Sequence, residues 1–232
     1  MKAGPAPSNV DVAVEALRDA IVDGRLKPGQ RLKEIPLAEQ LGVSRGPIRD
    51  ALRLLERDGL IEVIPNRGAV VPEVHALDVL EVYALRASLG SLALQKLMLE
   101  NRFPDDELEP ALKRLRTAVG RADPRRAADA DLAYQSAIIA GSGLLRVTRE
   151  FERLTWQVRS FMTGLAISYE DKLPRILAEV EALHVAIAAR HAIEAETLWR
   201  EKYERWVRNL VELLPETFDE QLWTALTSGR RA

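Results

Sequence analysis

The sequence predicts a mainly α-helical protein in which a small helical module with one β-hairpin precedes an antiparallel helical bundle. Apolar residues recur at helical spacing over most of the 232 residues. Two short segments rich in Val and Ile, 60–64 and 69–72, flank a four-residue turn from Pro65 to Gly68 and predict the hairpin. The composition, 47% hydrophobic and 29% charged, is that of a globular protein that buries a real core.

Glycine and capping residues divide the N-terminal module into its elements. Gly24 and Gly42 end the first two helices, and Ser44 is a good N-cap for the third, with Pro47 in its first turn. The three helices are predicted at residues 10–23, 35–41 and 45–58. Helix, short helix, tight turn, helix and hairpin is the layout of a winged helix-turn-helix.

The chain after residue 75 is predicted to be helical almost throughout. The helices are expected at about residues 77–100, 104–121, 124–141, 143–167, 172–190, 191–214 and 216–226. The fifth and sixth are hard to divide, because no Gly or Pro lies between Arg190 and Glu194. We expect a flexible leader over 1–9, the winged module over 10–74, an all-helical domain over 75–215 and a C-terminal tail over 216–232.

The composition excludes several classes of protein. The chain has no cysteine, which excludes disulfides and thiolate metal sites. No apolar run reaches the roughly 18 residues that a membrane span requires, and Met1 to Asn9 lacks the apolar stretch of a signal peptide. We therefore expect a cytoplasmic protein. The net charge of -2 does not by itself indicate a nucleic-acid partner.

The local distribution of charge does indicate such a partner. Four arginines and two acids lie between Gly42 and Arg57. Arg45 and Arg49 are four residues apart and share the face opposite the apolar positions, where they could reach guanine edges in the major groove. Arginines at this spacing can also merely solvate an amphipathic helix. The hairpin favours the first reading, because Arg67 at its tip has no role in a core.

The expected DNA contacts come from this third helix and from the hairpin. Ser44 offers a hydroxyl and the helix N-terminus offers N–H groups to a phosphate, while Gly46 lets the helix approach the groove. Gly68 lets the hairpin tip come close to a minor groove. The DNA-binding residues that we predict are Ser44, Arg45, Gly46, Arg49, Arg53, Arg67 and Gly68.

Residues 14–71, from VEALRD to RGAVV, resemble the DNA-binding domain of the GntR family of bacterial regulators. The helical remainder resembles the FadR branch of that family, which carries the FCD ligand-binding domain; the likeness extends over about residues 10–214. It implies a homodimer on a palindromic operator, with repression relieved by a small-molecule effector. Gly46 departs from the threonine often found there, so one polar contact is expected to be missing.

The resemblance also implies a metal site, which this sequence does not complete. Many FCD domains hold a divalent metal with an Asp-x-x-x-His pair and two later histidines. Asp131 is retained here, but Gln135 stands in the histidine's place. One register puts Val180 and Lys202 at the later histidine positions. The other register uses His184 and then Trp206, and since neither completes the site, we expect no metal and no cofactor.

Lys202 suggests a replacement for that metal. Its ammonium could lie where the cation would be and pair with Asp131, since a buried carboxylate is tolerated when it is paired. The alternative is that Lys202 lies on a solvated face.

The resemblance places Arg86 in the effector cavity, where arginine suits a carboxylate. Structurally, a lone arginine on a helix is more often at the surface, and aromatic residues at helical spacing are usually core. Tyr134 and Tyr203 could add apolar walls. The effector-binding residues that we predict, for a small organic acid, are Arg86, Asp131, Gln135, Trp156, His184, Lys202 and Trp206.

Two other classes of function compete with a regulator. Asp131, His184 and His191 could form an acid/base site on paper, but three scattered histidines without a nucleophile motif are weak evidence for an enzyme. A purely structural scaffold leaves the arginine face unexplained. We therefore expect no catalytic residues.

Overall fold

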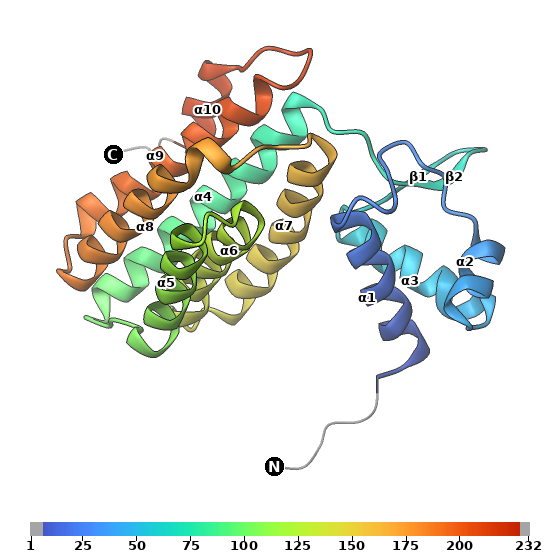
Figure 1. Cartoon of the computed structure of the whole chain (residues 1–232), viewed down its shortest axis with the longest axis horizontal. Helices are drawn as coiled ribbons and strands as arrows, with labels where there is room; N and C mark the ends of the chain where they lie inside the picture. The colour runs from blue at the N-terminus through green and yellow to red at the C-terminus, as the bar shows by residue number, and fades with distance from the viewer. Residues whose placement is uncertain (1–6, 228–232) are drawn as a thin grey trace. The chain divides into compact units, whose positions relative to one another are not determined.

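The computed structural model describes residues 7–227 and is mainly helical (Figure 1). The chain divides into two compact units. The first contains the described residues up to Val74 together with Trp156–Ala166, and the second contains His75–Thr155 and the described residues from Ile167 onward. No helix in the described part is both long and apolar enough to cross a membrane.

The first unit is a winged helix-turn-helix. Its elements are α1 (Asn9–Val22), α2 (Glu34–Leu41), α3 (Arg45–Arg57), β1 (Glu62–Ile64) and β2 (Gly68–Val70). Helix α1 begins earlier than residue 10, because Ser8 and Asp11 form a reciprocal capping box. Ser8 and Asn9, which were expected to belong to the leader over 1–9, thus form the start of α1; residues 1–6 of that leader lie outside the described part.

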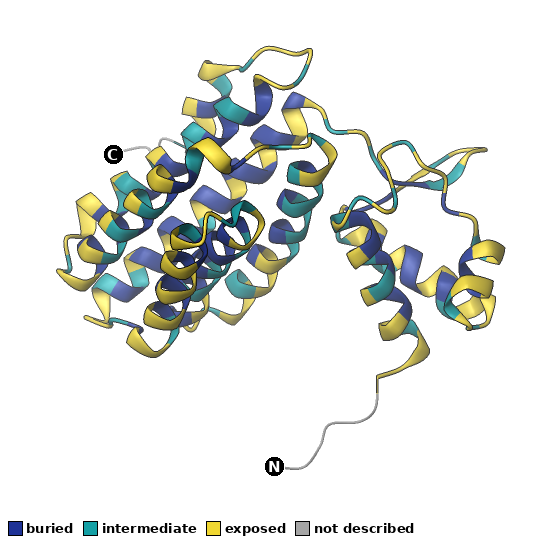
Figure 2. Ribbon diagram, viewed as in Figure 1, coloured by how far each residue is buried: buried dark blue, intermediate teal, exposed yellow. Residues whose placement is uncertain are grey.

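Helices α1 and α3 pack their apolar faces together to form the core of the first unit (Figure 2). Leu17 and Ile21 of α1 are buried in this core with Ile48 and Leu55 of α3. The same packing turns the opposite face of α3 toward solvent, as the period of 3.6 residues predicts.

The two strands form an antiparallel hairpin with Val63 opposite Ala69. Strand β1 is shorter than the predicted 60–64, because the Leu60 N–H donates to the Leu55 carbonyl and so closes the end of α3. Beyond β2, Val71 exchanges backbone hydrogen bonds with the loop before α2, at Gly29 and Gln30. The turn residues Pro65 to Gly68 thus predicted the position of the hairpin, but they did not predict where its two strands begin and end.

The second unit is a helical bundle. Its elements are α4 (Ala76–Leu99), α5 (Asp105–Gly120), α6 (Pro124–Gly141), the part of α7 (Leu145–Gly164) up to Thr155, a 3-10 turn (Glu170–Lys172), α8 (Leu173–Ala188), α9 (Ala192–Val211) and α10 (Glu220–Thr227). Helix α5 packs mainly on α6, and α4 on α9.

Two contacts fix α9 in this bundle. Gly90 lies directly against the Trp199 indole, which leaves no room for a Cβ, and the Trp199 Nε1–H donates to the Ala87 carbonyl at 3.1 Å. The division between α8 and α9, which the sequence left open, occurs at Arg190, whose φ is 63°. The Arg190 guanidinium donates to the Asn101 side chain and carbonyl, and this tertiary contact holds the break.

Candidate functional site

The exposed face of α3 begins at a helix N-terminus without a side-chain cap. Ser44 is the N-cap residue, but its hydroxyl accepts no capping hydrogen bond, so the hydroxyl and the first-turn N–H groups are available to a ligand. Arg45 is exposed and makes no hydrogen bond or ion pair within the described residues. No atom lies within 4 Å of a Cβ built on Gly46. The fold itself therefore does not require glycine at that position.

Arg49 is held by a carboxylate in the free protein. Its Nε and Nη2 donate to the two Glu34 carboxylate oxygens at 3.0 and 2.9 Å. The hydrogen bonds from Arg49 lower the pKa of Glu34 below its ordinary value, so this carboxylate stays charged at neutral pH. The sequence reasoning missed Glu34, because no local pattern links α2 to α3.

The hairpin tip carries a second exposed arginine. Asn66 and Gly68 both have positive φ, 63° and 80°, which turns the chain sharply at Arg67. Arg67 is exposed there. The Arg31 guanidinium lies 3.8 Å from a Cβ built on Gly68, so Arg31 adds positive charge beside the tip. No local pattern indicates a role for Arg31, which is brought beside the hairpin by its backbone bridge to Val70.

Arg53 continues the arginine face of α3. It is 71% exposed and lies 3.5 Å from Asp50 on the same helix. An exposed pair of this kind contributes little to stability.

A buried polar cluster lies inside the second unit, and Arg86 is at its centre. Arg86 is 1% exposed. Its guanidinium donates to the Phe151 carbonyl, the Thr155 hydroxyl and the Gln135 side-chain carbonyl, and it lies over the Phe151 ring at 4.0 Å. All of these partners are neutral. Within the described residues Arg86 forms no ion pair, and its Nε has no hydrogen-bond partner.

Gln135 links Arg86 to a buried carboxylate. The Gln135 carbonyl accepts from Arg86 Nη2 at 2.8 Å and from the Tyr203 hydroxyl at 2.7 Å. Its Nε2 donates to Asp131 Oδ2 at 3.1 Å. The Gln135 side-chain carbonyl therefore faces Arg86 and the Tyr203 hydroxyl, and its NH2 group faces the Asp131 carboxylate.

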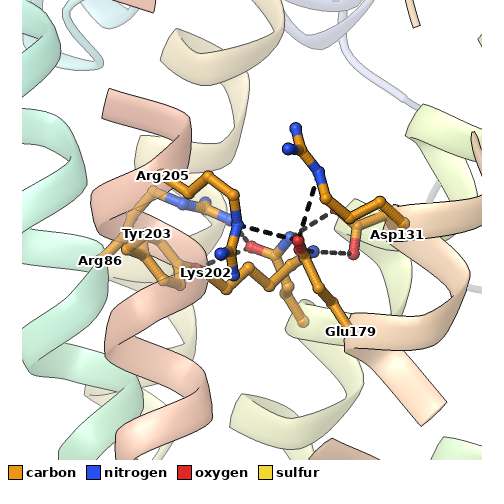
Figure 3. A network of polar contacts seen from close by, with 8 residues as sticks. Arg86, Asp131, Glu179, Lys202, Tyr203 and Arg205 are labelled. Carbon is orange, nitrogen blue, oxygen red and sulfur yellow. Dashed lines mark hydrogen bonds and ion pairs between the residues drawn. The ribbon is translucent and has the colours of Figure 1, made fainter. Parts of the chain in front are cut away.

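Lys202 lies between two carboxylates (Figure 3). Its Nζ is 3.0 Å from Asp131 Oδ1 and 3.6 Å from Glu179 Oε2, and Lys202 is 2% exposed. Arg205 forms an ion pair with the same Glu179, with Nε 2.9 Å from Oε1. The ion pair between Lys202 and Asp131 that the sequence predicted is present, and Lys202 is not on a solvated face.

This arrangement does not fit a divalent metal. The position beside Asp131 is filled by an ammonium, and the Gln135 group that faces Asp131 is an N–H donor, which cannot ligate a cation. Among residues 7–227, no three His, Asp or Glu side chains are grouped so that they could hold a metal ion. Of the two registers left open by the sequence, the structure brings Lys202 to Asp131.

Three of the predicted effector residues lie apart from this cluster. His184 contacts the Tyr134 hydroxyl through Nδ1 and Glu109 through Nε2. Trp206 stacks on Tyr169, with ring centroids 5.1 Å apart. Trp156 belongs to the first unit, where it packs against the core cluster of that unit. Aromatic residues at helical spacing occur both in cores and in ligand pockets, so the spacing alone does not distinguish the two for Trp156 and Trp206.

Two tyrosines close the cluster with neutral groups. Burial raises the pKa values of Tyr83 and Tyr203 well above the ordinary value for tyrosine, although the Arg86 charge opposes the shift in both. Both hydroxyls are therefore neutral at neutral pH. Their rings lie edge to face at 5.8 Å.

Comparison with known proteins assigns both units to families. Residues 9–71 match the profile of the bacterial regulatory proteins of the gntR family, and residues 81–205 match the FCD domain. This chain belongs to the GntR family. Its class is therefore that of a DNA-binding transcriptional regulator with an FCD domain, not of an enzyme.

The relatives of this GntR-family chain match it to different extents. The regulator McbR of Escherichia coli is 32% identical over 183 residues, which are 78% of this chain and 81% of McbR. The regulator YdhC of Bacillus subtilis is 44% identical over 79 residues, but the match covers 34% of this chain and 35% of YdhC. The solved structure of E. coli McbR/YncC aligns with a TM-score of 0.74 at 26% identity, covering 89% of this chain and 99% of that one.

Proposed function

We propose that this protein is a repressor of the FadR branch, which binds a palindromic operator as a homodimer in the cytoplasm. A small organic acid in the helical unit is proposed to control its affinity for DNA. The two parts of the proposal rest on different observations and have separate tests.

The face of α3 supports the DNA-binding part. Arg45 and Arg49 project from its first two turns, at the N-terminal end that a recognition helix presents to base edges. Ser44 is suited to a phosphate, and Gly46 permits close approach of the helix. Arg53 extends the face toward the DNA backbone.

The hairpin supports a second contact. Arg67 at its tip is proposed to enter the adjacent minor groove, and Gly68 keeps the tip narrow. Arg31 lies beside Gly68 and is proposed to contact the DNA backbone.

A gel-shift assay with DNA from upstream of the gene tests this part. The double substitution Arg45→Ala/Arg49→Ala should weaken binding by about 100-fold or more, since each bidentate base contact is worth about 1–3 kcal/mol. Arg146→Ala, which removes an exposed arginine of α7, is the matched control and should bind as the wild type does. Equal binding by the double variant and the control would exclude α3 as the recognition helix.

The effector part rests on the buried Arg86, which has no carboxylate partner among the described residues. A buried charge without a counter-ion is costly. An organic acid that binds there would supply the missing negative charge and accept two parallel hydrogen bonds from the guanidinium. Arg86, Gln135 and Tyr203 are the proposed contacts.

This site would respond to the effector through Gln135. An incoming carboxylate competes with the Gln135 carbonyl for Arg86 Nη2. The bond from Arg86 to Gln135 joins α4 to α6, so its loss is proposed to let α6 shift relative to α4. That shift is the proposed route by which the acid reduces affinity for DNA.

Thermal shift with carboxylate probes tests the effector part. Acetate, pyruvate, benzoate and succinate would each be compared with the corresponding neutral amide, because a ligand that binds only the folded state raises the melting temperature. Arg86→Met should abolish any carboxylate-specific shift, whereas Thr148→Val, on α7, should retain it. A shift that survives in Arg86→Met would place the acid elsewhere.

We also propose that this site works without a metal. Lys202 supplies the positive charge beside Asp131. Treatment with EDTA, followed by Zn²⁺ or Mn²⁺ alone, should leave the melting temperature of the wild type unchanged. A metal-specific rise that Asp131→Asn removes would contradict this.

A further inference from the structure

Helix α7 has residues in both units. Its part up to Thr155 belongs to the second unit, and the part from Trp156 onward belongs to the first. The helix contains no proline, and no glycine before its last residue, Gly164. Sharp kinks in helices arise mostly at such residues, so α7 continues without a hinge from one part to the other. A displacement of either part is therefore passed along the helix to the other.

In the second unit, Arg86 holds α7 through hydrogen bonds. Its Nη1 donates to the Thr155 hydroxyl and, at 3.3 Å, to the Phe151 carbonyl. The Thr155 hydroxyl in turn donates to the same Phe151 carbonyl at 2.7 Å. Thr155 is the last residue of α7 in this unit. The arginine proposed above to bind the effector thus also holds the end of this part of α7.

In the first unit, Gln157 holds the end of α3. Its Nε2 donates to the main-chain carbonyl of Asp58, the C-cap residue of α3, at 2.9 Å. The next residue, Gly59, has a φ of 73°. A Cβ built on Gly59 would lie 2.6 Å from Gln157 Nε2. Glycine at this position therefore permits both the turn and the close approach of the amide.

Trp156 contacts Asp58 indirectly, through a cation. The Arg18 guanidinium lies over the Trp156 ring, 5.0 Å from its centroid, and Arg18 Nη2 is 3.4 Å from Asp58 Oδ2. Trp156 also packs against the core cluster of the first unit. Two consecutive residues of α7 thus act on Asp58: Gln157 at its carbonyl, and Trp156, through Arg18, at its carboxylate.

A further hydrogen bond holds α7 to the end of α1. The Thr163 hydroxyl donates to the carbonyl of Val22, the last residue of α1, at 2.6 Å. A Cβ built on Gly24 would lie 2.9 Å from Thr163 Cγ2. The glycines after α1 and α3 therefore both leave room for a side chain of α7. Since α1 packs on α3, the two helices and this part of α7 form one packed body.

We infer that α7 transmits the state of the effector site to the recognition helix α3, with Thr155 and Gln157 as its positioning residues. This inference rests on the proposed function and names the element that couples its two parts. Because a guanidinium is planar and rigid, Arg86 cannot turn to an incoming carboxylate and keep its Nη1 bonds to Thr155 and Phe151. The effector thus releases α7 from α4.

Release of α7 changes the support at the end of α3. This helix has 13 residues and is about 20 Å long, with Asp58 beyond one end and Arg45 at the other. A small tilt at Asp58 displaces the Arg45 end, where base contacts require accurate placement. The movement of α6 proposed above stays within the second unit, whereas α7 continues into the first.

Hydrogen exchange on the full chain, without DNA or ligand, tests the coupling. The N–H groups of residues 58–60 close the end of α3. In Thr155→Val they should exchange about three- to ten-fold faster than in the wild type, the effect of losing one hydrogen bond of ordinary strength. Thr148→Val, the matched control, removes a hydroxyl that donates to the Leu144 carbonyl, and should exchange as the wild type does. Thr155→Ser, which keeps the hydroxyl, should do the same.

Two results of this experiment would overturn the coupling. One is unchanged exchange of residues 58–60 in Thr155→Val. The other is an equal acceleration over the whole chain, because that would mean a general loss of stability and no specific action on α3. The assay uses neither DNA nor an effector. Its result is therefore independent of whether α3 recognises the operator and of whether a carboxylate binds Arg86.

Gel-shift titration tests whether the coupling reaches DNA binding. Thr155→Val and Gln157→Met should each lower affinity for the upstream DNA by about five-fold or more, the low end of ordinary allosteric coupling. Gln157 is half-buried, so Gln157→Met keeps the test open if Thr155→Val does not fold. Gln221→Met, at an exposed position of α10, is its control and should bind as the wild type does.

The double variant Thr155→Val/Gln157→Met tests whether the two residues act through one helix. It should bind DNA no more weakly than the weaker single variant, because a signal already interrupted at one residue cannot be lost again at the other. Additive losses would overturn the coupling, and so would wild-type affinity in Gln157→Met. Failure of the Arg45→Ala/Arg49→Ala test would instead overturn the recognition helix, and the exchange experiment on α7 would still stand.

Discussion

The Lys202 ammonium lies 3.0 Å from the Asp131 carboxylate inside the FCD domain, where neither side chain is more than 6% exposed. Each charge is tolerated there only because the other is present. The pair joins α9 to α6, and through Gln135 it is continuous with Arg86. Removal of either partner should therefore affect stability as well as any response to an effector.

We predict that Lys202→Met destabilises the protein by about 3–5 kcal/mol, because it leaves the buried Asp131 carboxylate without its cation, whereas the half-buried Glu179 still has Arg205. Urea unfolding measures this. The double variant Lys202→Met/Asp131→Asn should lose clearly less than the sum of the two single variants. Lys113→Met, at an exposed position of α5, is the control and should change stability by less than about 0.5 kcal/mol. Strict additivity would mean that the two charges do not interact.

The ion pair between Arg49 and Glu34 predicts a competition on the DNA-binding face. Glu34→Gln removes a negative charge beside Arg49 and frees its guanidinium, so the affinity of the proposed DNA-binding face for the operator should rise by about three- to ten-fold at low salt. Gel-shift titrations measure this. Glu39→Gln, at another exposed position of α2, should change affinity less. A lower affinity in Glu34→Gln would mean that Glu34 holds Arg49 in its DNA-binding position.

The contact between Gly90 and Trp199 predicts a sharp cost for a single methyl group. Gly90→Ala should destabilise the protein by about 1–3 kcal/mol, because the indole is packed against the backbone and must move. Gly120→Ala has no atom within 4 Å of the new methyl and should stabilise α5 by up to about 1 kcal/mol. Thermal unfolding of both variants checks this. Similar melting temperatures for the two would contradict the packing.

The buried tyrosines predict a loss of stability at high pH. The pKa values of Tyr83, Tyr134 and Tyr203 are raised in the folded protein, chiefly by burial, above the value of 10.0 of an exposed tyrosine. The unfolded chain therefore binds fewer protons above pH 10, and the free energy of unfolding falls as the pH rises. Absorbance at 295 nm should show these three ionising only together with unfolding. Their ionisation in the folded protein would show that they are accessible to water.

The sequence predicted the local elements well where a signal lay within a few residues. Gly42 in the left-handed conformation ends α2 as expected, and Ser44 begins α3. The boundary between α8 and α9 could not be predicted, because it depends on the bond from Arg190 to Asn101 in a distant loop. The turn residues Pro65 to Gly68 also predicted the β-hairpin. They did not predict that Val71, just beyond β2, bonds to the Gln30 carbonyl in the loop before α2.

In the candidate sites, too, some features follow from local sequence patterns and others depend on tertiary contacts. The arginine face of α3 follows from helical period alone, since Ile48 and Leu55 must be buried. The engagement of Arg49 by Glu34 does not follow from it. Trp156 packs against the core of the first unit and Trp206 stacks on Tyr169, and their role in lining an effector cavity stays a prediction, because apolar spacing is the same in a core and in a pocket.

The amino-acid sequence by itself determined the winged module, the succession of helices and the outward arginines, because capping, turn preference and helical period act over a few neighbouring residues. Only the tertiary structure decided that Lys202 meets Asp131, that Glu34 holds Arg49 and that Arg86 is buried without a carboxylate. Each of these features depends on side chains from different helices, whether neighbouring in the chain, as for Glu34 and Arg49, or distant, as for Asp131 and Lys202. Their geometry is set by how the helices pack, which no local pattern encodes.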